Sequence, residues 1–242
     1  MNNIRQFPLR SAEYMLLSYN KFATASTYQE NHEPRCAVDE NSKTFWSAES
    51  GRAGEWFRID LGTLKSVHAV NVGVNFSASC VLYGSADGKS YDALFELSSE
   101  KSMMDDMIAF EGGKRFRFLK LEFVSDVPGC FSLNDFRVFG FGNGNVPQKV
   151  ENPFAFKSSN TQATICWNKV STAIGYKIRF GSDPSRLQNS ESVYNSDSLC
   201  LDFPCDSTCY YAVDSFNENG VTKGDVNVIN TVAVNKKIRH VQ

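Results

Sequence analysis

One short alternating segment constrains the fold more than any other part of the chain. Residues 55–61 read Glu-Trp-Phe-Arg-Ile-Asp-Leu, so apolar and polar side chains alternate before Gly62. A period of two indicates a β-strand with one buried face. The set on one side is Phe57, Ile59 and Leu61, and the set on the other side is Trp56, Arg58 and Asp60. Large aromatic side chains anchor small β cores, and we interpret both Trp46 and Trp56 as core residues.

Similar short apolar segments follow, separated by turn residues. They span residues 67–76, 81–83, 116–123 and 131–139. Asp87-Gly88 is a hairpin turn signal, and we interpret residues 98–106 as a loop. Many short strands at such spacing favour an antiparallel sandwich or barrel. We therefore expect an all-β protein.

The chain is long enough for two modest domains. Glycines crowd residues 140–144 ahead of Pro147, which is typical of a domain boundary. We predict a lead-in segment at 1–19, a first domain at 20–141, a linker at 142–148, a second domain at 149–235 and a basic tail at 236–242. The lead-in either ends a preceding domain or adds a strand to the first one. Within the second domain we expect strands at 163–167, 175–180 and 210–216, with a turn at 217–220.

Charge and hydropathy exclude several classes of protein. The chain has 25 Lys plus Arg and 27 Asp plus Glu, without the basic excess of a nucleic-acid-binding module. Its apolar runs are too short for a membrane span, and its first 21 residues lack the pattern of a secretory signal. Seven cysteines without a CxxC pair are interpreted mostly as buried free thiols, with a disulfide framework as the alternative.

The first domain resembles the discoidin family, also called F5/8 type C or family 32 carbohydrate-binding modules. The residues that carry the resemblance are Ala25-Ser26, Ala37-Val38-Asp39, Asn41, Thr44, Trp46, Glu55-Trp56, Ile59-Asp60-Leu61-Gly62, Tyr83-Gly84-Ser85, Asp87-Gly88, residues 117–121 and residues 136–140. The resemblance implies an eight-stranded jelly-roll β-sandwich.

The second domain resembles a fibronectin type III domain through Trp167, Tyr176, Tyr211, Val213 and the turn at 217–220. The resemblance implies a second, smaller β-sandwich. The order of the two domains is similar to the C-terminal accessory region of Bacteroidetes-type glycoside hydrolases of family 43. It implies a parent β-xylosidase or α-arabinofuranosidase, an upstream catalytic domain as a partner, and a periplasmic or extracellular location.

The discoidin resemblance also implies a structural Ca²⁺ site. Its ligands would be Asp39, Asn41 and Thr44, completed by Asp135 near the end of the domain. Oxygen-rich side chains in one turn suit a hard cation. The alternative is a turn that Asp39 caps with its own side chain.

Sugar binding is the main functional prediction, and the resemblance implies that it uses loops at one end of the sandwich. These loops are residues 27–34, 47–54, 75–79 and 125–131. Aromatic faces and planar polar groups recognise sugars. The candidate residues are Tyr28, His32, Arg52, Asn75, Phe76 and Phe131, and the ligand would be an oligosaccharide or polysaccharide.

The sequence offers no catalytic motif of the hydrolase, kinase or metalloprotease types. We therefore expect this chain to be non-catalytic. Two alternatives to sugar binding stay open. The chain is a structural brace or spacer for an upstream catalytic domain, or its discoidin domain binds a membrane surface or a protein. For membrane binding, Phe76 and Arg52 offer one apolar tip and one cation, which is too little for stable anchoring.

Overall fold

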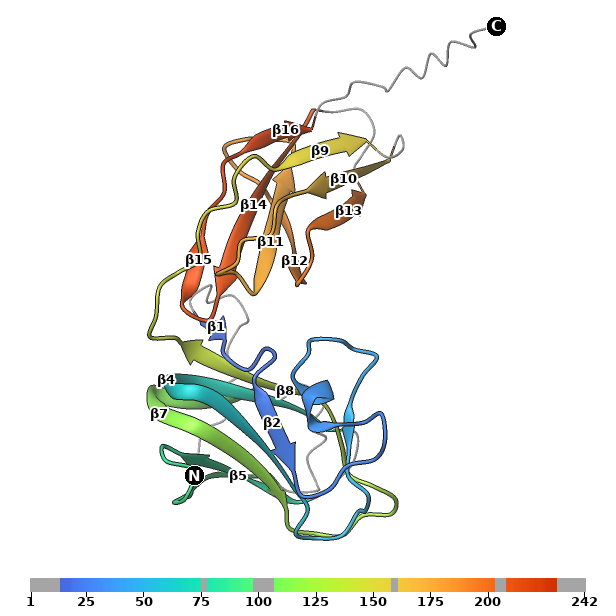
Figure 1. The fold of residues 1–242 in the computed structure, drawn as a ribbon, viewed down its shortest axis with the longest axis vertical. Coiled ribbons are helices and arrows are strands. Elements are labelled where there is room, and N and C mark those ends of the chain that lie inside the picture. Colours follow the sequence, from blue (N-terminus) through green and yellow to red (C-terminus); the bar gives the residue numbers. More distant parts are fainter. Residues whose placement is uncertain (1–13, 75–77, 98–106, 158–160, 203–207, 230–242) are drawn as a thin grey trace, which may run out of the picture. The chain divides into compact units, whose positions relative to one another are not determined.

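The fold is built almost wholly of β-strands (Figure 1). The computed structural model describes residues 14–74, 78–97, 107–157, 161–202 and 208–229. Within these ranges the helical elements are limited to one 3₁₀ turn, η1 (Pro34–Ala37). The chain divides into two compact units, Met1–Gly144 and Asn145–Gln242, and the division lies inside the predicted linker. The all-β prediction is confirmed.

The first unit contains eight described strands. They are β1 (Met15–Leu16), β2 (Phe22–Ala25), β3 (Trp46–Ser47), β4 (Trp56–Val74), β5 (Cys80–Ser85), β6 (Asp92–Leu97), β7 (Met107–Phe123) and β8 (Ser132–Phe141). Neighbours follow the order β1-β8-β4-β7-β5-β6, while β2 pairs with β4 and β3 pairs with β8. Each of these pairings is antiparallel.

Strand β4 joins the two layers of this sandwich. Its first part, residues 57–60, pairs with β2, whereas its later part, residues 66–74, pairs with β8. Strand β7 pairs with both parts, and its register shifts between the pairs of Asp60 and Lys65. Two separate strands were predicted here, at 55–61 and 67–76. The backbone instead continues through Gly62, whose φ of 83° is open to glycine without a steric penalty.

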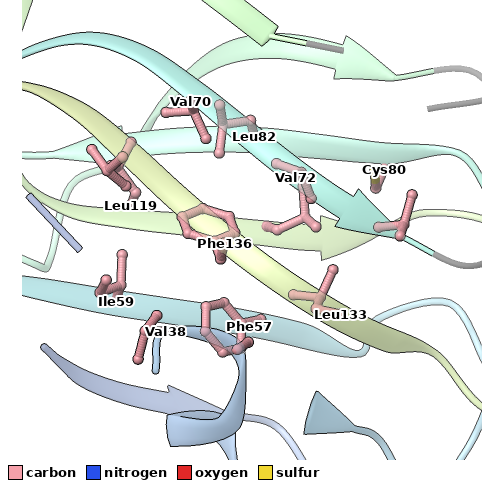
Figure 2. Close-up of a cluster of buried hydrophobic side chains, with 14 of the residues drawn as sticks. Val38, Phe57, Ile59, Val70, Val72, Cys80, Leu82, Leu119, Leu133 and Phe136 are labelled. Atoms are coloured by element: carbon pink, nitrogen blue, oxygen red, sulfur yellow. The ribbon is translucent and has the colours of Figure 1, made fainter. Parts of the chain in front are cut away.

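The core of the first unit confirms the alternation. Phe57, Ile59 and Leu61 are buried, as is Trp46. Figure 2 shows Phe57 next to Phe136 and Leu133 of β8, and Ile59 and Leu119 belong to the same buried cluster. Removing these apolar surfaces from water supplies the main driving force for the sandwich.

The interpretation of Trp56 as a core residue is wrong. Trp56 is only half-buried and is absent from the buried core cluster. Its ring lies under the guanidinium of Arg58, with 5.6 Å from Cζ to the ring centroid. Trp56 therefore follows the strand period, which sends it and Arg58 to the face opposite Phe57 and Ile59.

The hairpin predicted at Asp87-Gly88 connects β5 to β6. Oδ1 of Asp87 accepts hydrogen bonds from the backbone N–H groups of Lys89 and Ser90, at 2.8 and 2.9 Å. Gly88 has a φ of 74°. Both features are those expected of an Asp-Gly turn.

The predicted lead-in is partly described. Met15 and Leu16 of β1 pair with Gly140 and Phe139 of β8, and Leu17 is buried in the core. These residues therefore add a strand to the first unit. The loop predicted at 98–106 lies outside the described residues.

The second unit has two sheets. One holds β9 (Phe154–Lys157), β10 (Gln162–Cys166) and β13 (Ser198–Asp202); the other holds β11 (Gly175–Gly181), β12 (Asn189–Tyr194), β14 (Cys209–Asn217), β15 (Gly220–Thr222) and β16 (Asn227–Ile229). Trp167, Tyr176 and Ile178 are buried in its core. Strands β10, β11 and β14 lie where the sequence predicted strands, and Asn217 Oδ1 accepts a bond from the Asn219 N–H in the predicted turn.

Cys36, Cys80, Cys130 and Cys166 are free thiols, of which Cys36 and Cys80 are buried, as the sequence interpretation favoured. Burial raises the pKa of the Cys80 thiol to about 12. A thiol in such an environment behaves as a small apolar side chain.

Candidate functional site

Three segments that are distant in the sequence meet at one end of the first unit. The segment after β2 joins the end of β3 through the bonds from Gln29 N–H to Ser47 C=O, at 2.9 Å, and from Ser47 N–H to His32 C=O, at 3.2 Å. The segment before β8 joins through the bond from Ala48 N–H to Phe131 C=O, at 2.9 Å. These are three of the four loops that the sequence analysis assigned to sugar binding.

Bonds across the loops continue toward β4. The Val127 N–H donates to the Gly51 carbonyl at 2.8 Å. The Ala53 N–H donates to Oδ1 of Asp126 at 2.7 Å. Ser79, from the fourth predicted loop, donates its N–H to Oγ of Ser125 at 2.9 Å. The backbone of these loops is therefore fixed by many hydrogen bonds, which suits a largely pre-formed site.

Gly51 allows the loops of residues 47–54 and 125–131 to approach closely. A Cβ at Gly51 would lie 2.5 Å from the carbonyl oxygens of both Gly129 and Val127. Carbon atoms do not approach backbone oxygens so closely, so any side chain at this position would push the two loops apart.

Tyr28 and Arg52 are the predicted sugar-binding residues that this end exposes to solvent. Tyr28 keeps 51% of its surface accessible, and Arg52 is also exposed. They belong to two different loops that are bonded to one another. Together they offer an aromatic ring and a planar hydrogen-bond donor at the same end of the unit.

His32 lies in the same loop as Tyr28 but is half-buried. Its ring stacks on Phe45 with a centroid separation of 4.0 Å, and Nδ1 lies 3.3 Å from the Phe45 carbonyl oxygen. One ring face is therefore covered by protein. Asn75 and Phe76 lie outside the described residues.

Phe131 is wrong as a sugar-contacting candidate. It has no accessible surface, and its ring stacks on Phe123 with centroids 4.0 Å apart and planes 8° apart. The physical reason is that the backbone of Phe131 bonds to both Ala48 and Ser50, which draws its side chain inward. Phe131 is therefore a core residue next to the loops.

The residues predicted to bind Ca²⁺ form a hydrogen-bonded turn. Both carboxylate oxygens of Asp39 accept bonds from Oγ1 of Thr44, at 3.0 and 2.8 Å. Oδ1 also accepts the Asn41 N–H at 3.0 Å. This is the self-capped turn named as the alternative. The same three residues gather oxygen atoms in one turn, so they also fit a hard cation.

Asp135 has a different environment. Its Oδ2 lies 3.4 Å from Nη2 of Arg137, and Nε of the same guanidinium donates to Oε1 of Glu40 at 2.8 Å. Among the described residues, no group of three or more His, Cys, Asp or Glu side chains is placed to hold a metal ion. The Ca²⁺ site, with Asp39, Asn41, Thr44 and Asp135 as its ligands, stays a prediction.

Four polar residues that organise this end were not predicted from the sequence: Ser26, Thr27, Ser50 and Glu55. The carboxylate of Glu55 accepts hydrogen bonds from all three hydroxyls, and Glu55 is 8% exposed. A signal was present, because Glu55 shares the strand phase of the buried Phe57 and Ile59. An acid on the buried face of a strand requires hydrogen-bonding partners.

The comparisons with known proteins agree with the architecture of the first unit. The F5/8 type C domain family model matches residues 22–134. The comparison with curated proteins found no match. In the described residues no helix is long and apolar enough to cross a membrane.

Solved structures similar to this chain include three carbohydrate-binding modules. Chitosan-binding module 1 of a Paenibacillus sp. IK-5 chitosanase/glucanase is 24% identical, with a TM-score of 0.48, over 52% of this chain and 99% of that one. The family 32 module of C. perfringens NanJ, in complex with galactose, is 17% identical, with a TM-score of 0.46, over 52% and 98%. A Streptococcus pneumoniae fucose-binding module is 18% identical, with a TM-score of 0.45, over 52% and 94%.

Proposed function

We propose that the first unit is a non-catalytic carbohydrate-binding module. The observation that carries this proposal is the end of the first unit at which hydrogen bonds join the loops. Tyr28 and Arg52 are exposed there on loops whose backbone is held by these bonds. The F5/8 type C match at residues 22–134 supports it. The ring of Tyr28 would pack against the C–H face of a sugar. The guanidinium of Arg52 would donate hydrogen bonds to sugar hydroxyls.

The charges of the loops favour neutral sugars. The described side chains of residues 27–34, 47–54 and 125–131 include four acids, Glu30, Glu33, Glu49 and Asp126, and one cation that is always charged, Arg52. Like charges repel at close range, so sugars with carboxylates would bind less well. Neutral xylo- and arabino-oligosaccharides and galactosides are therefore the ligand class that we propose.

Isothermal titration of the full chain with these sugars tests the proposal. We expect measurable heat for the unmodified protein. Tyr28→Ala and Arg52→Ala should each cost about 1 kcal/mol, or roughly fivefold in Kd. Phe22→Ala is the matched control, because Phe22 is an aromatic residue with 71% exposure on β2, outside the loops. Equal losses in all three variants, or no heat with any sugar, would refute the proposal.

We propose that the wider setting is an accessory region of a glycoside hydrolase. In this proposal the second unit is a fibronectin type III-like spacer, and the parent enzyme is a periplasmic or extracellular xylosidase or arabinofuranosidase. The two-sheet arrangement of β9 to β16 and the buried Trp167–Tyr176 pair support the fibronectin-like assignment. Comparing the parent with and without residues 20–235 on insoluble polysaccharide and on a small aryl glycoside tests this setting. A loss restricted to the insoluble substrate is expected, and a loss of solubility alone supports the structural brace.

A further inference from the structure

Glu55 is a buried acid outside the residues that we assign to sugar contact. It directly precedes β4, and only 8% of its surface is accessible. Burying a carboxylate without partners costs several kcal/mol. Such a group persists in a folded protein when specific hydrogen bonds compensate that cost. The partners of Glu55 therefore indicate what it does.

Those partners come from two different loops. Thr27 donates its hydroxyl to the carboxylate at 2.9 and 2.8 Å from the two oxygens. Ser50 donates to Oε1 at 2.8 Å, and Ser26 donates to Oε2. A carboxylate has about four acceptor positions. Three hydroxyls therefore nearly fill its capacity, and the carboxylate holds the two loops at one point.

The same bonds lead to the exposed sugar-contact candidates. Tyr28 follows Thr27 directly in the chain. The N–H of Arg52 approaches Oγ of Ser50 at 3.4 Å, and the C=O of Arg52 accepts the Glu55 N–H at 3.4 Å. Both loops are therefore anchored to Glu55 within two residues of the side chain that would touch a sugar.

Thr27 adds a second connection between the loops. Its hydroxyl accepts the Glu49 N–H at 3.0 Å, and its carbonyl accepts the indole N–H of Trp46 at 3.1 Å. Removing the carboxylate would free the Thr27 hydroxyl to rotate, and the link to Glu49 would weaken with it.

We infer that Glu55 is a positioning residue for glycan binding, which fixes the loops of Tyr28 and Arg52 without touching the sugar. This inference rests on the proposed function. A site whose contact groups are held in place loses less conformational entropy on binding. Glu55→Gln keeps the size of the side chain but replaces one acceptor oxygen with a donor, so it disrupts the set of three hydroxyls.

The test uses the full chain and two measurements. In titrations with the neutral oligosaccharides above, Glu55→Gln should bind about tenfold more weakly than the unmodified protein because the loops are less ordered. Without sugar, hydrogen exchange should quicken at the amides of Gln29 and Glu49 and stay unchanged at Ile59. Ser18→Ala is the matched control, because Ser18 is a buried hydroxyl whose Oγ accepts the Val138 N–H, outside these loops. It should alter neither measurement at the loops.

If Glu55→Gln fails to fold, Thr27→Val and Ser50→Ala test the same inference. Each removes one donor to the Glu55 carboxylate and leaves the other two hydroxyls, so each should weaken binding less than Glu55→Gln does. Thr27→Val also removes the acceptor of the Glu49 N–H, so exchange in that variant is measured at Gln29. If sugar affinity and hydrogen exchange are unchanged in all folded variants while Tyr28→Ala still weakens binding, the role of Glu55 is refuted and the proposed function is not. Absence of binding by the unmodified protein would overturn both the proposed function and this role.

Discussion

Gly51→Ala is the substitution that most directly tests how the loop end is assembled. The added Cβ would lie 2.5 Å from the Val127 and Gly129 carbonyl oxygens and 2.9 Å from Cγ2 of Val127. Two of these three atoms are backbone, so the loops themselves would have to separate. The bond from the Val127 N–H to the Gly51 carbonyl, at 2.8 Å, would be strained by that movement.

The expected cost follows from these contacts. Overpacking of this kind destabilises a protein by about 1–3 kcal/mol. In a unit of this size, such a loss lowers Tm by roughly 4–12 °C. Sugar affinity should fall as well, since the loops of Tyr28 and Arg52 would no longer be held in their packed arrangement.

Calorimetry of the full chain measures the change, with Gly73→Ala as the control. Gly73 lies in β4 of the same unit, and a Cβ there would meet its nearest atom, the Asp135 nitrogen, at 3.4 Å, which is an ordinary contact. Gly73→Ala should be neutral or slightly stabilising, because alanine reduces the freedom of the unfolded chain. If Gly51→Ala melts at the temperature of Gly73→Ala, the close approach of the loops is refuted.

Two further predictions concern Cys80 and the Asp39 turn. Because burial raises the pKa of Cys80 to about 12, its thiol stays protonated at neutral pH, and iodoacetamide should modify it far more slowly than the half-exposed Cys130; equal rates by mass spectrometry would contradict this. If Asp39, Asn41 and Thr44 bind Ca²⁺ as proposed, saturation at 100 times Kd adds about 2.7 kcal/mol of stability. Chelation of a Ca²⁺-loaded sample should then lower Tm by several degrees, and Asp39→Ala should abolish the response. An unchanged Tm after chelation would favour the self-capped turn.

The fold was predictable because its signals are local. The alternation at residues 55–61 and the Asp87-Gly88 turn each act over a few residues, and both are present in the structure. The continuous path of β4 was not predictable in this way. A glycine such as Gly62 is equally consistent with the end of a strand and with a bend within one. Which of the two forms depends on the pairing of β4 with β2, β7 and β8.

The predictions for Trp56 and Phe131 are wrong for the same reason. Both were based on residue type, whereas the place of a residue in the strand alternation determines which face its side chain occupies. Trp56 was assigned to the core because of its size, although its phase is that of Arg58 and Asp60. Phe131 was assigned to a loop surface, although it immediately precedes β8. In both cases the backbone direction decided burial, because successive strand residues point to opposite faces whatever their chemistry.

The same rule explains why the loop end depends on Glu55. Glu55 and Trp56 are neighbours, and the pleat sends one inward and the other outward. The side chain of Glu55 points inward at the edge of the core, where the apolar packing ends and the loops begin. Its hydrogen-bond donors must therefore come from those loops. Ser26 and Thr27 are 29 and 28 residues away from Glu55 in the chain, and only the closing of the sandwich brings them to it. The buried carboxylate of Glu55 therefore fixes the position of an exposed residue such as Tyr28. In the sequence, Glu55 is visible only as a polar residue at a position of the strand where the alternation predicts an apolar one.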